Sequence, residues 1–592
     1  MKLSTFIFSL VCALTMLSPA VFAQSNDILS QGFGNRAVND ELSRKYISPK
    51  SLIILPDSLS AGVKNADALL LPYTGQIAVE PGEVCELSTL NGNQAAILLD
   101  FGRELTGSLE ITAPIRDSKK ASKVRVRFGE SVSEAMSDIN NPATTATNEH
   151  STRDFIIELP WLGSIEVGNS GFRFARIDLV DDNSVLHLKN IRAVLRYRDI
   201  PYIGSFRSSN PRLDSIWATG AYTVHLNMQN YLWDGVKRDR LVWVGDMHPE
   251  LMTIANVFGD FSLVKKSLDF ARDTSPLPSW MNGIAAYSMW WVLIHRDLFM
   301  HEGDIDYLRQ QKEYMNNLFS LLASKMDGNK ENLKEGFRLL DWPTSEMPDV
   351  IHAGYQALMA MTMEAGMQIA EWTDDAQMKK TCSNALNKLR KHHPDNMHNK
   401  QAAAMLLLSG LSSKPLSDAE VIISGGPNGF STFYGYYMLE ALAKAGLFDD
   451  AQNILSDYWG AMLDLGATTF WEDLSYDEVK KASRIDQPVP EGAFDIHADS
   501  GAYCYVGHRH SFCHGWASGP TAWLSRYVLG VRPAAPGFSE VIIEPHLGSL
   551  DWAEGSVPTP HGPIHVRHSR RPDGSIDTSF SLPDGCSIKE VV

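Results

Sequence analysis

The chain has 592 residues, of which 44% are hydrophobic and 21% are charged, and its formal net charge at pH 7 is −17. A chain of this length is too long for one small core, so we expect two to four domains. The acidic balance argues against a nucleic-acid backbone or an anionic membrane surface as the partner.

The first residues are typical of an export signal. Lys2 supplies a positive charge, the run from Phe6 to Leu17 is apolar, and Val21-Phe22-Ala23 forms a small-residue cleavage site. The apolar run is too short to span a bilayer, and no later segment is long and apolar enough, so we expect no membrane insertion. We expect a signal peptide over residues 1–23 and an exported mature chain, located in the periplasm or, alternatively, secreted.

The cysteines do not form a disulfide framework. Without Cys12, which lies in the predicted signal, five remain, and an odd and sparse set is not typical of disulfide-stapled domains. Cys504 and Cys513 are one candidate pair, but we favour buried free thiols. Neither the spacing nor the neighbouring residues suggest a zinc site.

After a polar lead-in over residues 24–49, the segment 50–206 has the pattern of a β-sandwich. Short β-type runs alternate between turn residues, at 123–128, 154–159, 175–180 and 191–197. The run from Asp100 to Gly107 is expected to be a strand that ends in a turn. A β pattern returns over residues 531–592, where 541–545 and 562–568 alternate, and predicts a small C-terminal β-domain.

Helical patterns recur from residue 207 to 530. Asn210-Pro211 is a good helix start, because proline suits the first helical position. Further helices are expected at 261–272, 285–300, 304–324, 354–372, 375–391, 432–445 and 451–463. Pairs of helices repeated about six times indicate a central (α/α)6 barrel with its site among the loops at one end of the ring. An irregular helical solenoid is the alternative, since no repeat motif is visible.

The stretch from Asp234 to Asp246 concentrates groups that can do chemistry. It contains three carboxylates (Asp234, Asp239, Asp246), two guanidiniums (Arg238, Arg240) and the indole of Trp243. Its glycines and β-branched residues disfavour a continuous helix, so we expect a loop that enters a helix near Met247. Such a run is often only a solvated, salt-bridged loop, but the neighbouring Trp233 and His248 favour a partly buried cluster, and loops on a rigid scaffold often carry function.

A second candidate is Glu472, which follows Thr468-Thr469-Phe470-Trp471. Burial beside aromatic rings would raise its pKa or leave its anion poorly hydrated and basic, whereas a surface position would make it unremarkable chemically. Asp341-Trp342 repeats the pairing of acid and indole. Carboxylates beside aromatics are what cleavage of a glycosidic bond requires, since one carboxyl group donates a proton and another activates water or attacks.

Other chemistries find less support. His508, His510 and His514, with Asp495 and Asp499, form a possible metal set, but the aromatic residues between them suit a sugar pocket better. The sequence contains no Gly-x-Ser-x-Gly elbow, no P-loop and no His-Glu-x-x-His helix. We therefore expect neither a metal nor a cofactor.

These motifs resemble those of the inverting α-L-rhamnosidases of glycoside hydrolase family 78. The likeness rests on the Asp234–Asp246 run, on Gly466-Ala-Thr-Thr-Phe-Trp-Glu472 and on Ser511-Phe-Cys-His514, in this order. Weaker similarities extend it from about residue 50 to 550. The resemblance implies the same three-part architecture, with a β-sandwich, an (α/α)6 barrel and a C-terminal β-domain.

The resemblance also implies roles for individual residues. Asp239 takes the place of the general acid and Glu472 that of the general base. Asp234, Arg238 and Asp246 fall on sugar-binding positions, and Trp243, Asp341, Trp342, Trp471 and His514 are expected to line the pocket. Two departures stand out: the family often has Glu at the position of Asp239, and Asn at that of Cys513, which is expected to alter the pocket wall. The segment 477–499 is expected to be a loop on the leaving-group side.

The sequence thus predicts an exported hydrolase that releases terminal α-L-rhamnose from glycosides or oligosaccharides with inversion. Its partner would be a carbohydrate, and its oligomeric state is not defined by the sequence. One alternative is an exo-glycosidase of the same scaffold that acts on another L- or deoxy-sugar, because a fold does not fix a substrate. Another is a non-catalytic carbohydrate-binding homologue, against which the carboxylates in both catalytic places argue.

Overall fold

The structure is a computed structural model that describes residues 41–72, 83–114, 120–138, 152–503 and 505–589. The predicted signal peptide, residues 24–40 of the lead-in, and Cys504 lie outside the described residues. Residues Arg44–Val592 form one compact unit.

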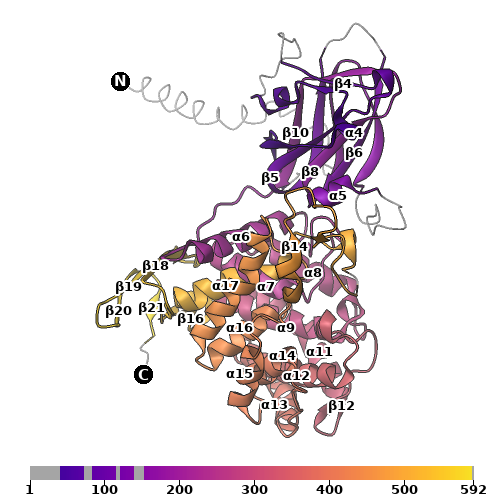
Figure 1. The fold of residues 1–592 in the computed structure, drawn as a ribbon. Helices are drawn as coiled ribbons and strands as arrows, with labels where there is room; N and C mark the ends of the chain where they lie inside the picture. The colour runs from indigo at the N-terminus through magenta and orange to yellow at the C-terminus, as the bar shows by residue number, and fades with distance from the viewer. Residues whose placement is uncertain (1–40, 73–82, 115–119, 139–151, 504, 590–592) are drawn as a thin grey trace, which may run out of the picture. The chain divides into compact units, whose positions relative to one another are not determined.

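The first part of this unit is a β-domain with two sheets (Figure 1). The larger sheet has the order β1-β10-β5-β8-β6-β7, with β2 also paired to β5, and the smaller has the order β3-β4-β9. Side chains of both sheets meet in one hydrophobic core, which includes Leu87, Leu99, Val126 and Leu188. The strands are β1 (Ser43–Ile47), β2 (Ser51–Ile53), β3 (Val63–Lys64), β4 (Cys85–Ser88), β5 (Ala96–Ala113), β6 (Ser122–Gly129), β7 (Asp154–Leu159), β8 (Gly163–Leu179), β9 (Val185–Leu188) and β10 (Asn190–Tyr197).

The strand predicted to end near Gly107 continues to Ala113, so that expectation was wrong. β5 pairs with β8 along its length and passes through a register shift between Asp100 and Leu105, where Gly102 has a φ of +82°. Glycine tolerates this φ, and the bulge bends the strand without ending it. A Cβ at Gly107 would lie 2.0 Å from the Val194 carbonyl oxygen of β10, which explains the glycine there as a close approach of strands.

Helices dominate the chain from Pro211 to Trp523. They are α6 (Pro211–Asn227), α7 (Met247–Val257), α8 (Ser262–Thr274), α9 (Ala285–Glu302), α10 (Ile305–Gln310), α11 (Lys312–Ser324), α12 (Pro348–Trp372), α13 (Ala376–Leu389), α14 (Lys400–Ser409), α15 (Pro415–Ile423), α16 (Gly435–Lys444), α17 (Phe448–Asp464) and α18 (Gly519–Trp523). The helix start at Asn210 is confirmed, since its side chain accepts a hydrogen bond from the backbone of Arg212. The helix predicted over 304–324 is two helices that meet at Gln311.

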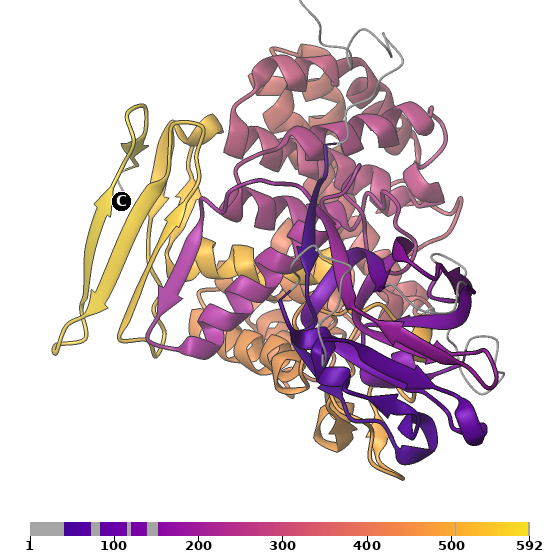
Figure 2. The same cartoon turned by 90° about the horizontal axis from the view of Figure 1, so that it is seen from above.

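The chain ends in further strands (Figure 2). One sheet has the order β11-β18-β19-β20 and another β16-β17-β21. Their bounds are β11 (Ser205–Ser208), β16 (Val531–Pro533), β17 (Glu540–Ile543), β18 (Trp552–Val557), β19 (Ile564–Arg570), β20 (Ile576–Ser581) and β21 (Ser587–Ile588). β11 directly precedes α6 in sequence, yet it pairs with β18, so a strand at the predicted boundary of residue 206 belongs to the C-terminal sheet.

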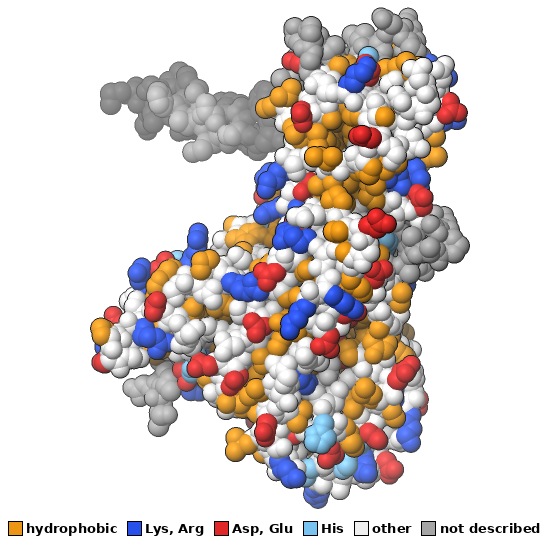
Figure 3. Space-filling model, viewed as in Figure 1, with side chains coloured by type: hydrophobic (Ala, Val, Ile, Leu, Met, Phe, Trp, Pro, Cys, Tyr) orange, Lys and Arg blue, Asp and Glu red, His pale blue; other side chains and the backbone are white. Residues whose placement is uncertain are grey.

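Two further expectations concern cysteines and membranes. Cys85, Cys382 and Cys513 are buried free thiols, and Cys586 is a partly exposed one. Among the described residues, no helix combines the length and the hydropathy that a membrane span needs. On the face drawn in Figure 3, acidic and basic side chains of the described residues are interspersed rather than separated by sign.

Candidate active site

Loops that lead into and out of the helices enclose a cavity of about 360 Å³. All of the predicted site residues line it except Asp341 and Trp471. The lining consists of Asp234, Arg238, Asp239, Trp243, Asp246, Asn282, Ile284, Tyr287, Phe337, Leu339, Trp342, Glu472, Arg509, His514 and Trp516. Three segments that are remote in sequence therefore meet where the motifs predicted.

The loop between α6 and α7 carries the first group of carboxylates. Its residue Gly235 forms a β-bridge with His514, and the Asp234 carbonyl accepts a 2.7 Å hydrogen bond from the backbone of Gly515. The Asp234 carboxylate in turn accepts from the backbone of Leu241 at 2.9 Å, which closes the loop on itself. The loop enters a helix at Met247, as predicted.

Asp239 stands at the sharpest point of this loop. Asp239 and Arg240 have φ values of +55° and +59°. Aspartate is among the residues that tolerate this left-handed conformation. The Trp243 indole donates to Asp239 Oδ2 at 3.0 Å, and the Arg238 guanidinium lies 3.5 Å from Oδ1. Both contacts orient the carboxyl group at the cavity wall.

Glu472 faces the same cavity from the other side of Arg238. The Arg238 guanidinium contacts Glu472 Oε1, and the Ser511 backbone N–H donates to Oε2 at 3.1 Å. The Glu472 backbone N–H also donates to the Ser511 carbonyl at 2.9 Å. Burial raises the pKa of Glu472, and the Arg238 charge opposes that rise. One guanidinium thus bridges the two carboxylates that the motifs singled out.

His514, Asp246 and Asp234 form a polar floor. The Nε2 atom of His514 lies 3.6 Å from Glu472 Oε1 and 3.7 Å from Asp246 Oδ2. Burial lowers the pKa of His514 well below its usual value, so the ring is neutral. Burial also raises the pKa of Asp234 and of Asp246 well above the usual range. The floor therefore offers hydrogen-bond donors and acceptors with little net charge, which suits the hydroxyl groups of a sugar.

Aromatic rings form much of the remaining wall. Trp342 stacks near Tyr503 with centroids 6.3 Å apart, and it contacts the Phe337 ring at 5.8 Å. Trp516 stacks with Phe433 behind the wall at 4.7 Å. Flat apolar faces beside polar groups are typical of small-molecule pockets. Carboxylates, a neutral imidazole and rings around one cavity match the chemistry of a glycoside site.

Two predicted lining residues lie behind the wall. Asp341 accepts hydrogen bonds from Ser431 at 2.6 Å and from Gln401 at 3.0 Å, and burial raises its pKa to about 6. Trp471 is 1% exposed and stacks on Phe512 with centroids 4.1 Å apart. Both side chains face the protein interior, so the expectation that they line the pocket was wrong in each case.

Cys513 also departs from its expectation. Its thiol is fully buried in the core of the β-domain, where Sγ lies 3.9 Å from the Asn227 side chain, and it does not reach the cavity.

The histidines considered as a possible metal set lie in two different places. His514 faces the cavity, whereas His508 and His510 lie with His497 in a different cluster. His508, His510 and His514 therefore do not form one metal set.

Several lining residues gave no sequence signal. Asn282, Ile284, Tyr287, Phe337 and Leu339 lie in segments without a recognisable motif, and Arg509 lies between His508 and His510, which indicated only a possible metal set. Tyr287 is the most consequential of them, because its hydroxyl donates to Asp246 at 3.2 Å. Trp516 lies two residues after His514, and that proximity was the only sequence signal that it lines the cavity.

The packing around the cavity predicts that alanine substitutions at two glycines differ strongly in their effect on stability. A Cβ at Gly515 would lie 1.5 Å from Glu250 Oε1, a fully buried carboxyl, whereas a Cβ at Gly235 meets no atom closer than 3.4 Å. Overpacking costs about 1–3 kcal/mol. We expect Gly515→Ala to lower the melting temperature clearly in a thermal scan. Gly235→Ala, in the facing loop, is the matched control, and equal effects of the two would contradict the packing seen here.

The chain matches two family models. The bacterial α-L-rhamnosidase six-hairpin glycosidase domain matches residues 201–404, and the bacterial α-L-rhamnosidase C-terminal domain matches residues 530–592. In sequence, the chain is 24% identical over 555 residues to an α-L-rhamnosidase of Alteromonas sp. (strain LOR), which covers 85% of this chain and 56% of that protein. It is 24% identical over 427 residues to an α-L-rhamnosidase of Streptomyces avermitilis, covering 65% of this chain and 38% of that protein.

Solved structures share the fold. The GH78 family rhamnosidase of Bacillus sp. GL1 aligns with a TM-score of 0.70 at 20% identity, covering 89% of this chain and 56% of that one. The rhamnosidase from Klebsiella oxytoca with rhamnose bound aligns with a TM-score of 0.65 at 18% identity, covering 82% and 96%. The chain spans only about half the length of the first relatives that it matches. In its motifs, in the two matched family models and in its fold, the chain is similar to the α-L-rhamnosidases of glycoside hydrolase family 78.

Proposed function

We propose that this chain is a glycoside hydrolase that releases terminal α-L-rhamnose from glycosides or oligosaccharides with inversion. The observation that carries the proposal is the placement of Asp239 and Glu472 on one cavity, bridged by the Arg238 guanidinium. The names of the relatives support rhamnose as the sugar. The cavity of about 360 Å³ supports a small terminal unit, because it falls at the low end of the range of ligand pockets.

In the proposed reaction, Asp239 is the general acid and Glu472 the general base. Asp239 protonates the glycosidic oxygen as the bond to the leaving group breaks. Glu472 takes a proton from a water molecule that attacks the opposite face of the sugar, which inverts the anomeric carbon. Burial and the raised pKa make Glu472 a stronger base than an exposed glutamate. The separation expected for such a pair is roughly 6.5–9.5 Å, which leaves room for the water.

Asp234, Arg238, Trp243, Asp246, Trp342 and His514 would bind the sugar. The neutral His514 and the carboxyl groups of Asp234 and Asp246 supply directional hydrogen bonds to hydroxyl groups. Trp342 supplies an apolar face for the C–H bonds of the ring. We propose no metal and no cofactor in this reaction, since acid, base and sugar contacts all come from side chains.

We extend the proposal to the architecture and the location. The helices would form an (α/α)6 barrel over residues 207–530, flanked by a β-sandwich over 50–206 and a C-terminal β-domain over 531–592. The shared fold with the rhamnosidases supports this arrangement. The export signal predicted over residues 1–23 supports a periplasmic or secreted enzyme. N-terminal sequencing of the mature protein would test the cleavage.

The first experiment is release of L-rhamnose from p-nitrophenyl α-L-rhamnoside, followed by proton NMR in the first minutes. We expect the β-anomer to appear first and the α-anomer later by mutarotation. Early α-anomer would contradict inversion. A panel of other aryl L- and deoxy-glycosides tests the sugar, and rapid release of a different sugar would replace rhamnose. Binding of sugar without turnover over days would favour a non-catalytic homologue.

Arg238 gives a prediction about pH. Its charge lowers the pKa of Glu472, against the larger opposing effect of burial. Without that charge the pKa of Glu472 rises, and a base works only when it is deprotonated. We therefore expect Arg238→Met to move the acid limb of the kcat/KM profile to higher pH, so that activity at pH 5 falls more than at pH 7. Arg240→Met is the control, because Arg240 contacts Asn169 rather than Glu472. An unmoved limb in Arg238→Met would contradict the coupling.

A further inference from the structure

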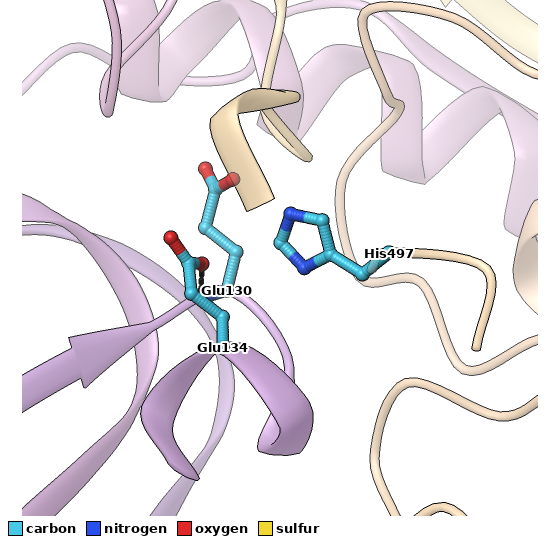
Figure 4. Close-up of side chains that lie close together, drawn as sticks. All are labelled: Glu130, Glu134 and His497. Atoms are coloured by element: carbon cyan, nitrogen blue, oxygen red, sulfur yellow. Dashed lines mark hydrogen bonds between the residues drawn. The ribbon is translucent and has the colours of Figure 1, made fainter. Parts of the chain in front are cut away.

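A buried group of ionisable side chains joins the β-domain to the loops of the candidate active site. Glu130 and Glu134 follow β6, and His497 comes from the segment after α17 (Figure 4). One potential ligand atom from each lies within 4.8 Å of the others, which is the spacing of a metal site. All three side chains are buried.

A cation already occupies this space, and it is an ammonium. Lys237 Nζ lies 2.9 Å from Glu130 Oε2 and 3.2 Å from Glu134 Oε1. It also donates to the His508 carbonyl at 3.0 Å and to the His510 carbonyl at 2.5 Å. Carboxylates and carbonyls around a point charge are the surroundings that a buried ammonium needs. Arg153 adds a second positive charge against Glu134.

His497 is arranged as a neutral hydrogen-bonding ring rather than as a ligand. Its Nε2 atom lies 3.0 Å from the His510 carbonyl and 3.4 Å from Lys237 Nζ. Its Nδ1 atom is 2.7 Å from the Ser131 hydroxyl. With both ring nitrogens engaged and an ammonium between the carboxylates, the cluster holds Lys237 in the place that a metal would take.

The cluster touches both halves of the candidate catalytic machinery. Lys237 immediately precedes Arg238 and Asp239 in the chain. Glu130 Oε2 accepts a second hydrogen bond, at 2.6 Å, from the backbone N–H of Phe512. The residue before Phe512 is Ser511, whose own N–H holds the Glu472 carboxylate. The Glu130 carboxylate therefore binds Lys237 and the backbone of Phe512. Lys237 is next in sequence to Arg238, which contacts Asp239, and Phe512 is next to Ser511, which contacts Glu472.

His510 extends this connection on the side of Glu472. Its Nε2 atom accepts a 2.9 Å hydrogen bond from the backbone N–H of Asp473, the residue after Glu472. Its carbonyl accepts from Lys237. The ammonium therefore joins the loop of Asp239 to the segment of Glu472 through the backbone of residues 508–512.

We propose that Glu130 is a positioning residue, which through Lys237 and Phe512 fixes the loop of Asp239 against Glu472. This inference rests on the function proposed above, since it takes Asp239 and Glu472 as the acid and the base. Its physical reason is that a misplacement of about 1 Å in a reacting group can lower the rate about 10²-fold. The β-domain would then contribute to turnover without touching the substrate.

The test compares Glu130→Gln with Asp178→Asn. Asp178 is also a carboxylate of the β-domain paired with two arginines, Arg127 and Arg176, but it has no link to the loops of the cavity. We expect Glu130→Gln to lower kcat by about 10-fold to 10²-fold with KM little changed. Asp178→Asn is expected to keep both parameters. Equal kcat values for wild type and Glu130→Gln, measured well below both melting temperatures, would overturn the proposal.

A second measurement does not depend on the reaction. Hydrogen exchange should be faster in Glu130→Gln than in wild type for peptides that cover residues 234–246 and 508–514, and unchanged there in Asp178→Asn. If wild type hydrolyses no glycoside, the proposed function fails, and this exchange difference alone decides whether Glu130 holds the loops. Unchanged exchange would overturn the positioning role even in an active enzyme.

If Glu130→Gln does not fold, the pair Glu130→Gln with Lys237→Met removes both charges together, and such neutral replacements of a buried ion pair are often tolerated. The same loss of kcat and the same faster exchange are expected.

Elemental analysis of the purified wild type should find no stoichiometric metal. A bound metal that is lost in Glu134→Gln would overturn the assignment of this space to Lys237.

Discussion

Asp239→Asn is expected to lower kcat/KM by about 10²–10⁴-fold on a rhamnosyl disaccharide, and by much less on p-nitrophenyl α-L-rhamnoside. The asparagine amide keeps the shape of the side chain and its contact with the Trp243 indole, but it cannot donate the proton that a sugar alcoholate needs in order to leave. A nitrophenolate leaves without protonation. The dependence on the leaving group, measured as the ratio of the two losses, is thus the signature of a general acid.

Asp239→Glu provides the control, because it restores a carboxyl group with a longer reach. We expect it to retain more activity on the disaccharide than Asp239→Asn, although glutamate tolerates the φ of +55° less well than aspartate. Equal losses on both substrates in Asp239→Asn would contradict the role of acid. They would indicate instead that Asp239 orients Arg238 or the sugar.

Local sequence signals predicted the parts of the fold that depend on local physics. Asn210-Pro211 marked the start of α6, since a cap and a preset φ act within one turn. The alternation over 123–128 marked β6, and the loop before α7 followed from its glycines and valines. These features are decided by a few neighbouring residues, so the sequence contains them directly.

Features that depend on distant partners escaped prediction. β5 continues past Gly107 because β8 and β10 pair with it on both sides, and its own residues only indicated a turn. β11 joins β18, which lies more than 300 residues later in the chain. The residue pattern of a short stretch of sequence cannot indicate such pairing. The free energy that stabilises the paired strands comes from contacts that form only in the folded chain.

The candidate site shows the same division. Asp234, Asp239 and Asp246 lie in one loop, so a single motif captured them, and Glu472 and His514 each belong to a motif of their own. Phe337 and Arg509 line the cavity through packing between segments that are far apart in sequence. Trp471 illustrates the opposite error: its neighbour Glu472 faces the cavity, while the Trp471 ring stacks on Phe512 in the interior.

Glu472→Gln is expected to lower kcat/KM by about 10²–10⁴-fold on both the disaccharide and the nitrophenyl substrate. A general base acts on water, and water must lose its proton whichever leaving group departs. Glutamine keeps one acceptor oxygen, which can serve either Arg238 or the Ser511 N–H, and its shape matches that of glutamate, so we expect the fold to survive, as a thermal scan would check. The absence of leaving-group dependence distinguishes this variant from Asp239→Asn.

Azide separates the two roles and tests the stereochemistry at once. Azide is an anionic nucleophile that needs no general base, so it should restore turnover of p-nitrophenyl α-L-rhamnoside by Glu472→Gln. Attack from the face that water uses would give the β-L-rhamnosyl azide, and NMR distinguishes it from the α-anomer. An α-azide would mean that a group on the protein had first displaced the leaving group. In that case Glu472 could not be the base of a single displacement, and the reaction would have to pass through a covalent glycosyl-enzyme intermediate.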